Sequence, residues 1–131
     1  MPALRTGIDL VEIERLENLK PEIRIRFCQR VFTMQELAYA GGRLERLAAM
    51  FAAKEAVAKA LGCGIGPIHW KDIEIRHTDE GQPYLELAGP ARNLARQLGL
   101  QSWSLSLTHT RTTAAAVVVA LGGDLTDDEP E

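Results

Sequence analysis

One stretch decides the fold of this chain: Phe51-Ala52-Ala53-Lys54-Glu55-Ala56-Val57-Ala58-Lys59-Ala60-Leu61-Gly62. It completes a segment, Arg43–Leu61, that contains no glycine or proline and is rich in Ala, Leu, Glu and Lys, so we expect one long helix there. The run Gly62-Cys63-Gly64-Ile65-Gly66-Pro67 ends this helix. Glu55 and Lys59 stand one turn apart, and a carboxylate beside a lysine near a glycine-rich turn is suited to holding a metal ion and a phosphate together.

At about 100° per residue, Glu55 and Lys59 project from the side of this helix opposite its large apolar residues, which are Leu47, Met50, Val57 and Leu61. One interpretation is a solvent-exposed pair worth about 0.3–0.5 kcal/mol. The other depends on the small residues that flank the pair, Ala48, Ala52 and Ala56. Because alanines let a ligand or another subunit come close, we expect this side of the helix to be covered.

Before the long helix we expect a strand over residues 4–10, a helix from about Val11, a helix over 21–30, and a short helix that begins with the capping box of Thr33 and Glu36. After it we expect a hairpin of strands 72–77 and 84–87, a helix over 90–98, and two paired strands, 103–109 and 114–121. The predicted fold class is α+β, with a small, mostly antiparallel sheet packed on one long helix.

The length of 131 residues suits a single domain, which we place at residues 1–121. The composition, 46% hydrophobic and 25% charged, is typical of a globular protein, and the chain has no apolar run of about 18 residues that would span a membrane. Cys28 and Cys63 lack metal-ligand spacing and are expected to be thiols in a reducing compartment, with the cytoplasm as the default. Residues 122–131 are acidic and without pattern, so we expect a disordered tail.

Charge is unevenly distributed along the chain. The net charge is −3, but five acids lie in residues 122–131, and the remainder carries 13 acids against 15 bases. Bases cluster early in the sequence at Arg15, Lys20, Arg24, Arg26 and Arg30. This cluster is either a solvated helix face or a docking patch for an anionic partner.

Two further sites have both a structural and a functional interpretation. Asp9 stands where the first strand is expected to give way to a helix, and with Glu12 it also matches a capping box. Thr108-His109-Thr110 follows a predicted strand and is suited either to binding a phosphate or to capping a turn. The glycines at 62, 64 and 66 present backbone N–H groups that suit a phosphate, although no Walker-type pattern is present.

Taken in order, these pieces resemble the holo-acyl-carrier-protein synthase family of 4'-phosphopantetheinyl transferases. The matching blocks extend over about residues 4–121 and are Gly7-Ile8-Asp9-Leu10-Val11 with Arg15, Phe32-Thr33-x-x-Glu36, the stretch 51–62, Trp70-x-Asp72-Ile73, Gly81-x-Pro83 and Leu105-Ser106-Leu107-Thr108-His109-Thr110. The set of Asp9 with Lys-Glu-x-x-x-Lys is highly specific, and the ordered set of blocks is more specific still. Two departures are Thr108, where the family usually has serine, and Thr112-Thr113, where an aromatic residue is common.

The resemblance implies transfer of the 4'-phosphopantetheine arm of coenzyme A to a serine of an apo acyl carrier protein, with release of adenosine 3',5'-bisphosphate. It implies Mg²⁺ held by Asp9 and Glu55, since magnesium takes a few carboxylates together with water and phosphate oxygens. Lys59 would stabilise the charge that develops on the phosphate oxygens. Glu55 would help to remove the serine proton, either directly or through a metal-bound water. Asp9, Glu55 and Lys59 are the expected catalytic residues.

Other roles also follow from the resemblance. Coenzyme A would be bound by Lys59 together with Arg43, Arg46, Gly62, Gly64, Thr108 and His109. Arg15 and Arg24 would dock the acidic carrier protein, adding association rate and orientation. The family also implies a homotrimer with active sites at subunit boundaries, and neither a nucleic acid nor a membrane is expected as a partner.

Two other functions stay open on the residues alone. One is a non-catalytic binding module for coenzyme A or the carrier protein that keeps the fold, and the other is a different magnesium-dependent enzyme that processes nucleotides. The presence of Asp9, Glu55 and Lys59 disfavours the binding module, because binding alone does not require all three.

Overall fold

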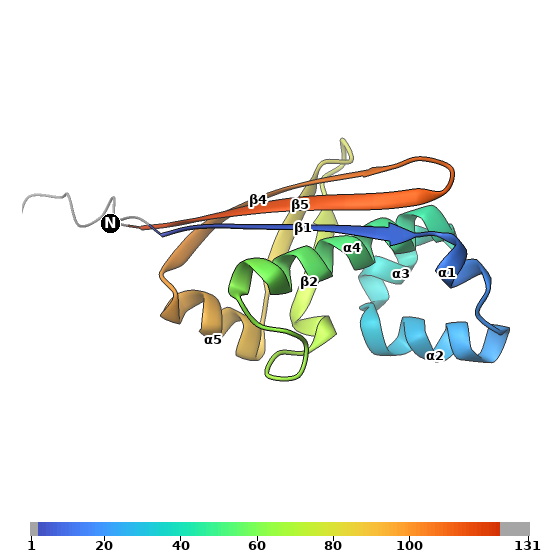
Figure 1. Cartoon of the computed structure of the whole chain (residues 1–131), viewed down its shortest axis with the longest axis horizontal. Helices are drawn as coiled ribbons and strands as arrows, with labels where there is room; N and C mark the ends of the chain where they lie inside the picture. Colours follow the sequence, from blue (N-terminus) through green and yellow to red (C-terminus); the bar gives the residue numbers. More distant parts are fainter. Residues whose placement is uncertain (1–2, 124–131) are drawn as a thin grey trace, which may run out of the picture.

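The computed structural model describes residues 3–123. Its elements are β1 (Leu4–Glu12), α1 (Glu14–Glu17), α2 (Pro21–Val31), α3 (Met34–Ala40), α4 (Leu44–Leu61), the 3-10 turn η1 (Trp70–Asp72), β2 (Ile73–His77), β3 (Pro83–Leu87), α5 (Gly89–Gln97), β4 (Leu100–His109) and β5 (Thr113–Gly122). Figure 1 shows the three long strands lying across α4. Strand β5 extends one residue into the predicted tail, and residues 124–131 of that tail lie outside the described part.

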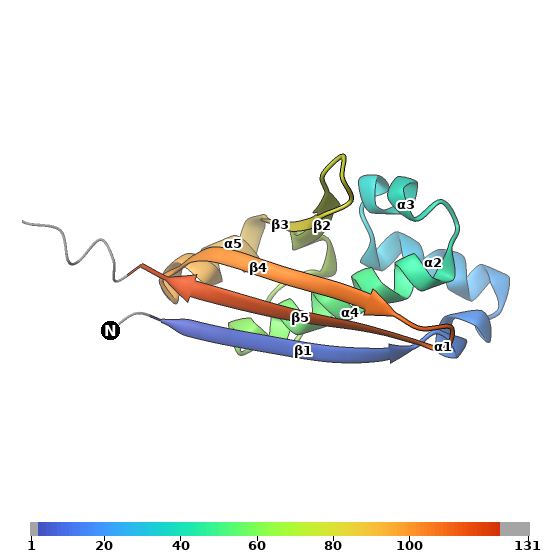
Figure 2. The same cartoon turned by 90° about the horizontal axis from the view of Figure 1, so that it is seen from above.

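Both sheets are antiparallel, as the alternating sequences predict. The larger one has the order β1-β5-β4, so the first strand and the last hairpin lie together although almost the whole chain separates them. In this sheet Ala116 of β5 is opposite Asp9 on one side and Leu107 on the other. The smaller sheet is the β2–β3 hairpin. Figure 2 shows the large sheet from above, with α5 toward one end and α2 and α3 toward the other.

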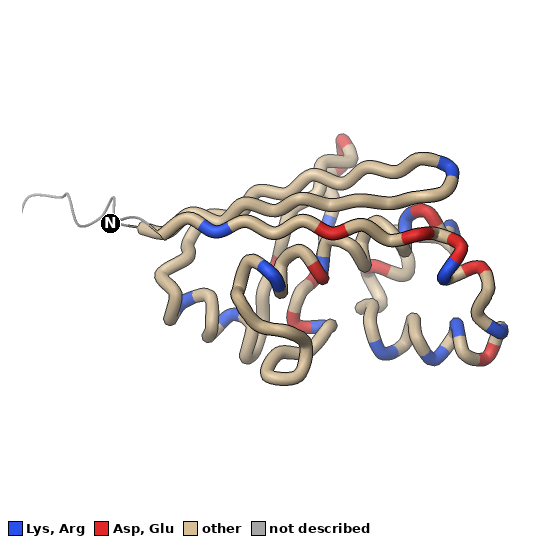
Figure 3. The backbone as a smooth tube through the Cα atoms, in the orientation of Figure 1, with Lys and Arg blue, Asp and Glu red and all other residues tan. Residues whose placement is uncertain are grey.

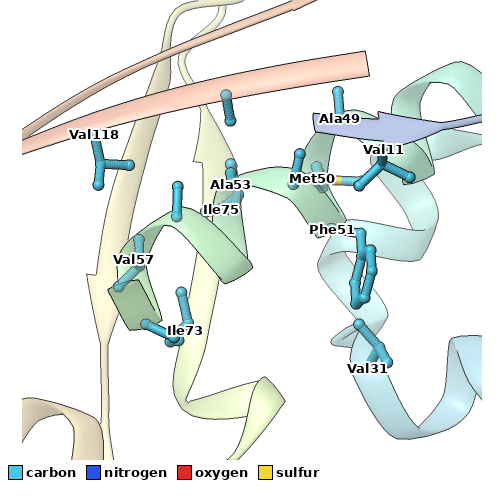
Figure 4. Close-up of a cluster of buried hydrophobic side chains, with 14 of the residues drawn as sticks. Val11, Val31, Ala49, Met50, Phe51, Ala53, Val57, Ile73, Ile75 and Val118 are labelled. Carbon is cyan, nitrogen blue, oxygen red and sulfur yellow. The ribbon is translucent and has the colours of Figure 1, made fainter. Parts of the chain in front are cut away.

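Helix α4 is the centre of the hydrophobic core. It packs against β1 and β5 on one side, and in Figure 4 Val118 of β5 lies on that side while Ile73 and Ile75 of β2 lie on the other. The alanines that flank Glu55 (Ala48, Ala52 and Ala56) are fully buried within the chain itself. This side of the helix is therefore covered, as expected, and the chain's own sheet covers it.

The contact between β1 and α4 is unusually close, and it depends on Gly7. A Cβ atom built at Gly7 would lie 1.8 Å from the carbonyl oxygen of Ala56, so no side chain fits there. The strand backbone consequently rests directly on the helix backbone. Asp9, the next residue on the same face of β1, is thereby brought beside the Glu55 side of α4.

The first predicted helix differs from the structure. Strand β1 continues through Leu10 and Val11 to Glu12, which pairs with Thr113 of β5, and α1 starts only at Glu14. Asp9 therefore lies inside a strand, and the capping box with Glu12 is wrong. Pairing with β5 extends the strand because it satisfies backbone hydrogen bonds that a short helix cannot supply.

The capping box at Thr33 is confirmed. Thr33 Oγ1 accepts a hydrogen bond from Glu36 N at 3.2 Å, and Thr33 N donates to Glu36 Oε1 at 2.9 Å. The helix ends at Gly41, which adopts the left-handed conformation at φ +56°. Among residues 3–123, no helix is long and apolar enough to cross a bilayer.

Candidate active site

Asp9, Glu55 and Lys59 come together although two of them are far from Asp9 in sequence. Lys59 Nζ donates to Asp9 Oδ1 at 3.0 Å and to the carbonyl oxygen of Ile8 at 2.9 Å. The Lys59 side chain is 58% exposed and that of Asp9 is 15% exposed. The Lys59 ammonium is therefore open to solvent and can bind a ligand there while it keeps its contact with the Asp9 carboxylate.

Glu55 is the residue of the three whose pKa is clearly shifted. Burial raises the pKa of its carboxyl, the negative charge of Asp9 raises it further, and Lys59 and Arg15 act in the opposite direction. Two carboxylates are therefore held close enough to repel each other. A cation placed between them would remove the repulsion that raises this pKa.

One oxygen of Asp9 is left without a partner. Among residues 3–123, Oδ2 of Asp9 is buried and no donor reaches it. A protonated Glu55 would donate a hydrogen bond to Asp9, and this bond is a further cause of the raised pKa of Glu55. A buried oxygen that lacks a donor and faces a second carboxylate fits a hard divalent cation such as Mg²⁺.

The protein ligands of such an ion would be few. Within the described residues there is no group of three or more His, Cys, Asp and Glu side chains that could form a closed metal site. Asp9 and Glu55 would leave several coordination positions to water and to the oxygens of a substrate, which is the arrangement magnesium prefers when it acts on phosphates. The donor set fits the predicted ion.

The predicted phosphate-binding residues surround two adjoining depressions at the start of α4. One has a volume of about 640 Å³ and includes Arg43, His109 and Arg111 in its lining. The second, of about 280 Å³, includes Arg46, Thr108 and again His109. The structure thus brings Arg43, Arg46, Thr108 and His109 together, with His109 at the boundary between the two depressions.

This group lies apart from the carboxylates. Arg46 and Glu55 are nine positions apart on α4, which is about two and a half turns, so they project from opposite sides of the helix. Asp9 is on the outer strand β1, whereas Thr108 and His109 are on the other outer strand, β4. Neither depression is lined by Asp9, Glu55 or Lys59. A single copy of the chain therefore separates the predicted site into two parts.

The glycine-rich loop belongs to the part of the site that contains Asp9, Glu55 and Lys59. Gly62 caps α4 in the left-handed conformation at φ +78°, directly after the turn that contains Lys59. Gly62 and Gly64 are exposed, and no atom lies within 4 Å of a Cβ built at Gly64. The backbone of this loop is open to a ligand that also contacts Lys59.

Sequence reasoning missed two residues that line the smaller depression. The rings of Tyr39 and His77 are stacked with centroids 3.7 Å apart, and the guanidinium of Arg46 lies 4.6 Å from the Tyr39 centroid. Arg46 also donates to the Tyr39 carbonyl at 2.8 Å. Burial and the charge of Arg46 lower the pKa of His77. No sequence pattern joins these residues, because they come from α3, α4 and β2.

The two arginines expected to dock the carrier protein have different surroundings. Arg15 is exposed on α1 and is close enough to Glu55 for its charge to lower the pKa of that group. Arg24 of α2 donates to the carbonyls of Leu16 and Glu17 at 3.0 and 2.9 Å, so it ties the end of α1 to α2. Figure 3 shows further basic residues spaced along α2.

Residues 5–118 match the family model of the 4'-phosphopantetheinyl transferase superfamily, and the chain belongs to this superfamily. Within it, the chain is similar to holo-[acyl-carrier-protein] synthases. It is 48% identical over 120 residues to that of Moorella thermoacetica, covering 88% of this chain and 92% of the relative. It is 39% identical over 127 residues to the synthase of Thermoanaerobacter sp. strain X514, and the match covers 95% of this chain and 91% of the relative.

The fold is that of solved members of the family. The structure of Helicobacter pylori holo-[acyl-carrier-protein] synthase in complex with coenzyme A matches with a TM-score of 0.80 at 32% identity, covering 88% of this chain and 98% of that one. The α+β fold expected from the resemblance is thereby confirmed.

Proposed function

We propose that Asp9, Glu55 and Lys59 carry out the chemistry of a holo-acyl-carrier-protein synthase. Membership of the superfamily and identities of 39% and 48% to such synthases establish the reaction: the chain transfers the 4'-phosphopantetheine group of coenzyme A to apo acyl carrier protein. The observation that supports the assignment of residues is the buried, donor-free Oδ2 of Asp9 beside the Glu55 carboxyl.

Asp9 and Glu55 would together hold a magnesium ion. When bound, the ion would neutralise the pyrophosphate link of coenzyme A, which otherwise repels an incoming oxygen nucleophile. Two observations support this role. Oδ2 of Asp9 has no donor, and the pKa of the Glu55 carboxyl is raised by its burial and by the negative charge of Asp9.

Lys59 and Glu55 have separate tasks in this mechanism. The Lys59 ammonium is exposed enough to bind a phosphate oxygen while Asp9 orients it, so it would stabilise the charge on the leaving 3',5'-bisphosphate nucleotide. Glu55 has a raised pKa, which makes its carboxylate a better acceptor for the proton of the carrier serine. The positive charge of the nearby Arg15 acts against this rise in pKa and so favours the ionised form of Glu55.

Coenzyme A would be bound by the second part of the site, around Arg43, Arg46, Thr108 and His109. Because this part lies on the opposite side of α4 from Glu55, we propose that a second copy supplies it. The outer face of the large sheet supports a homotrimer, since it is apolar and exposed at Leu4, Ile8, Leu10, Val117, Val119 and Leu121. β1 is an outer strand of this sheet, so a copy packed on the exposed face around Ile8 and Leu10 would lie next to the sheet edge that contains Asp9.

The carrier protein would approach along α1 and α2. Arg15 is exposed and near Glu55, so it is suited to guiding an acidic partner to the site. Arg24 contributes to the same surface while holding α1 in place. Cys28 and Cys63 are both free thiols, which supports the cytoplasm as the location.

A mass-shift assay tests the function. Apo acyl carrier protein is incubated with coenzyme A, magnesium and the full-length protein, and the carrier is weighed by mass spectrometry. We expect the mass of one phosphopantetheine group to be added and adenosine 3',5'-bisphosphate to be released. Binding of coenzyme A without an added mass would instead favour a non-catalytic binding module, and release of a different nucleotide would favour another magnesium-dependent enzyme.

A further inference from the structure

Helix α4 contains a buried charge that the reaction does not use. The side chains of Lys54 and Glu36 are both 0% exposed, and Lys54 Nζ lies 2.8 Å from Glu36 Oε1. Lys54 Nζ also donates to the carbonyl oxygen of Trp70 at 3.0 Å and to that of Ile73. Every proton of the ammonium therefore has a fixed acceptor, and the acceptors belong to α3, η1 and β2.

Both carboxylate oxygens of Glu36 also have hydrogen-bond partners. Its Oε1 accepts from Thr33 N at 2.9 Å, and its Oε2 accepts from Ile75 N at 2.7 Å. One carboxylate thus joins the start of α3, the middle of α4 and the strand β2. A methionine at position 54 would fill a similar volume without a desolvation cost, and buried ion pairs often stabilise a fold no better than such a replacement. Stability alone is therefore a weak reason for this pair.

The surface of α4 suggests what the pair contributes. From Leu47 to Leu61 every residue of the helix except Glu55 and Lys59 is buried, and seven of the buried residues are alanines: Ala48, Ala49, Ala52, Ala53, Ala56, Ala58 and Ala60. A helix with a polar and an apolar face is oriented by that boundary, but a helix that is buried all round lacks this signal. Alanines also offer little relief for side chains to interdigitate, so packing alone resists rotation of α4 weakly.

We propose that Lys54 is a positioning residue, whose bonds to Glu36 and to the Trp70 and Ile73 carbonyls set the rotation of α4 and thereby aim Glu55 at Asp9. Successive residues on a helix point about 100° apart, so directing Lys54 into the interior beside β2 turns Glu55 toward β1. Lys59, one turn beyond Glu55, is oriented by the same constraint. This inference depends on the cation site proposed above.

The test compares Lys54→Met, Glu36→Gln and the double variant with the wild-type protein. Mn²⁺ is the probe, since it takes the same oxygen ligands as magnesium. It is titrated by calorimetry into full-length protein with saturating coenzyme A, and a titration without protein is subtracted. The temperature is kept well below the melting temperature of each variant, so that only folded protein is measured. Turnover and the magnesium concentration for half-maximal turnover are recorded in parallel.

We expect both single variants and the double variant to bind Mn²⁺ about tenfold more weakly, with a raised half-maximal magnesium concentration, by analogy with other residues that orient metal ligands. The double variant keeps the test valid if a single one does not fold, since it leaves no buried charge unpaired. Leu100→Ala, a core truncation at the opposite end of the sheet from Asp9, is the control. It should lower the melting temperature and leave Mn²⁺ affinity unchanged.

Two results would overturn the inference, and they differ. If the wild-type protein binds Mn²⁺ and the folded double variant binds it equally well, the pair only stabilises the fold. If the wild-type protein shows no Mn²⁺ binding beyond that of coenzyme A alone, the cation site itself is wrong, and the inference is wrong with it.

Discussion

Lys59 Nζ and Asp9 Oδ1, separated by 50 residues of sequence, are 3.0 Å apart, and this contact unites the last turn of α4 with the middle of β1. The contact uses only one oxygen of Asp9. The other oxygen lies buried beside Glu55, where no donor of residues 3–123 reaches it. In the proposed function the same aspartate would orient a cationic side chain for a phosphate and would present a ligand to a metal ion, and each role is open to a separate experiment.

Replacing Asp9 by alanine is expected to weaken the binding of magnesium. Turnover should fall, and the magnesium concentration for half-maximal turnover should rise by about tenfold or more, because one of two protein ligands is lost. The measurement is the rate of the mass shift across a magnesium titration. Glu12→Ala removes an exposed carboxylate from the same strand and serves as the control. Full activity of Asp9→Ala at limiting magnesium would remove Asp9 from the site.

Lys59→Ala is expected to lower kcat by a factor on the order of 10²–10³, the usual effect of losing one electrostatic donor to a transition state. The exposed position of Lys59 means that the fold should be unaffected, and circular dichroism checks this. Lys71→Ala, an exposed lysine outside the site, is the control. Unchanged turnover would show that Lys59 forms only a surface ion pair.

The raised pKa of Glu55 predicts that the folded protein loses stability as the pH rises. Its pKa is raised above the ordinary value of 4.5, so the folded protein favours the protonated form. Below that ordinary value both the folded and unfolded states are protonated, and no stability is lost. At higher pH Glu55 is ionised in the unfolded chain, whereas the folded protein still favours its protonated form. The free energy of unfolding therefore falls as the pH rises through the raised pKa of the folded state.

Glu55→Gln should abolish this loss. In the presence of a chelator, the variant is expected to melt at a higher temperature than the wild-type protein at pH 7, and the difference should disappear below about pH 4. Thermal melts from pH 3.5 to about 8 make the measurement. Added magnesium should stabilise only the wild-type protein. Parallel melting curves at every pH would show that the two carboxylates do not interact.

The proposed division of the site between two copies predicts complementation. Asp9→Ala and His109→Ala each inactivate a different part, so each variant alone should have little activity. When the two are unfolded, mixed in equal amounts and refolded together, roughly a quarter of the subunit boundaries should join two intact parts, by random association in a symmetric oligomer. The mass-shift assay measures the recovery. Absence of any recovery in a mixture that forms oligomers would show that one copy contains the complete site.

The docking surface is tested by reversing charge at Arg15 and Arg24. Arg15→Glu should slow association with the carrier protein and reduce the effect of salt on that rate, with little change in melting temperature because the residue is exposed. Arg24→Glu should also lower the melting temperature, because it breaks two hydrogen bonds that hold α1. Stopped-flow association at several salt concentrations, with thermal melts, separates the two effects. An unaltered salt profile would place the docking surface elsewhere.

Local patterns in the sequence predicted most of the elements. The long helix, the capping box at Thr33, the β2–β3 hairpin and the final strand pair were predictable because turn residues, caps and period-two alternation act over a few neighbouring residues. The boundary of β1 was not predictable from such signals. Val11 and Glu12 belong to a strand only because β5, about 100 residues later, pairs with them.

The sequence by itself determined which side chains are available for the chemistry: two carboxylates, a lysine one turn from Glu55, and the glycines that end the helix. The tertiary structure decided where they lie, because it brought Gly7 against Ala56, placed Asp9 beside Glu55, and put Arg46 and His109 on the far side of α4. It also revealed the buried pair of Lys54 and Glu36, which no local pattern separates from an ordinary surface charge and a helix cap. The physical reason is that burial and repulsion depend on distances between segments remote in sequence, and only packing sets those distances.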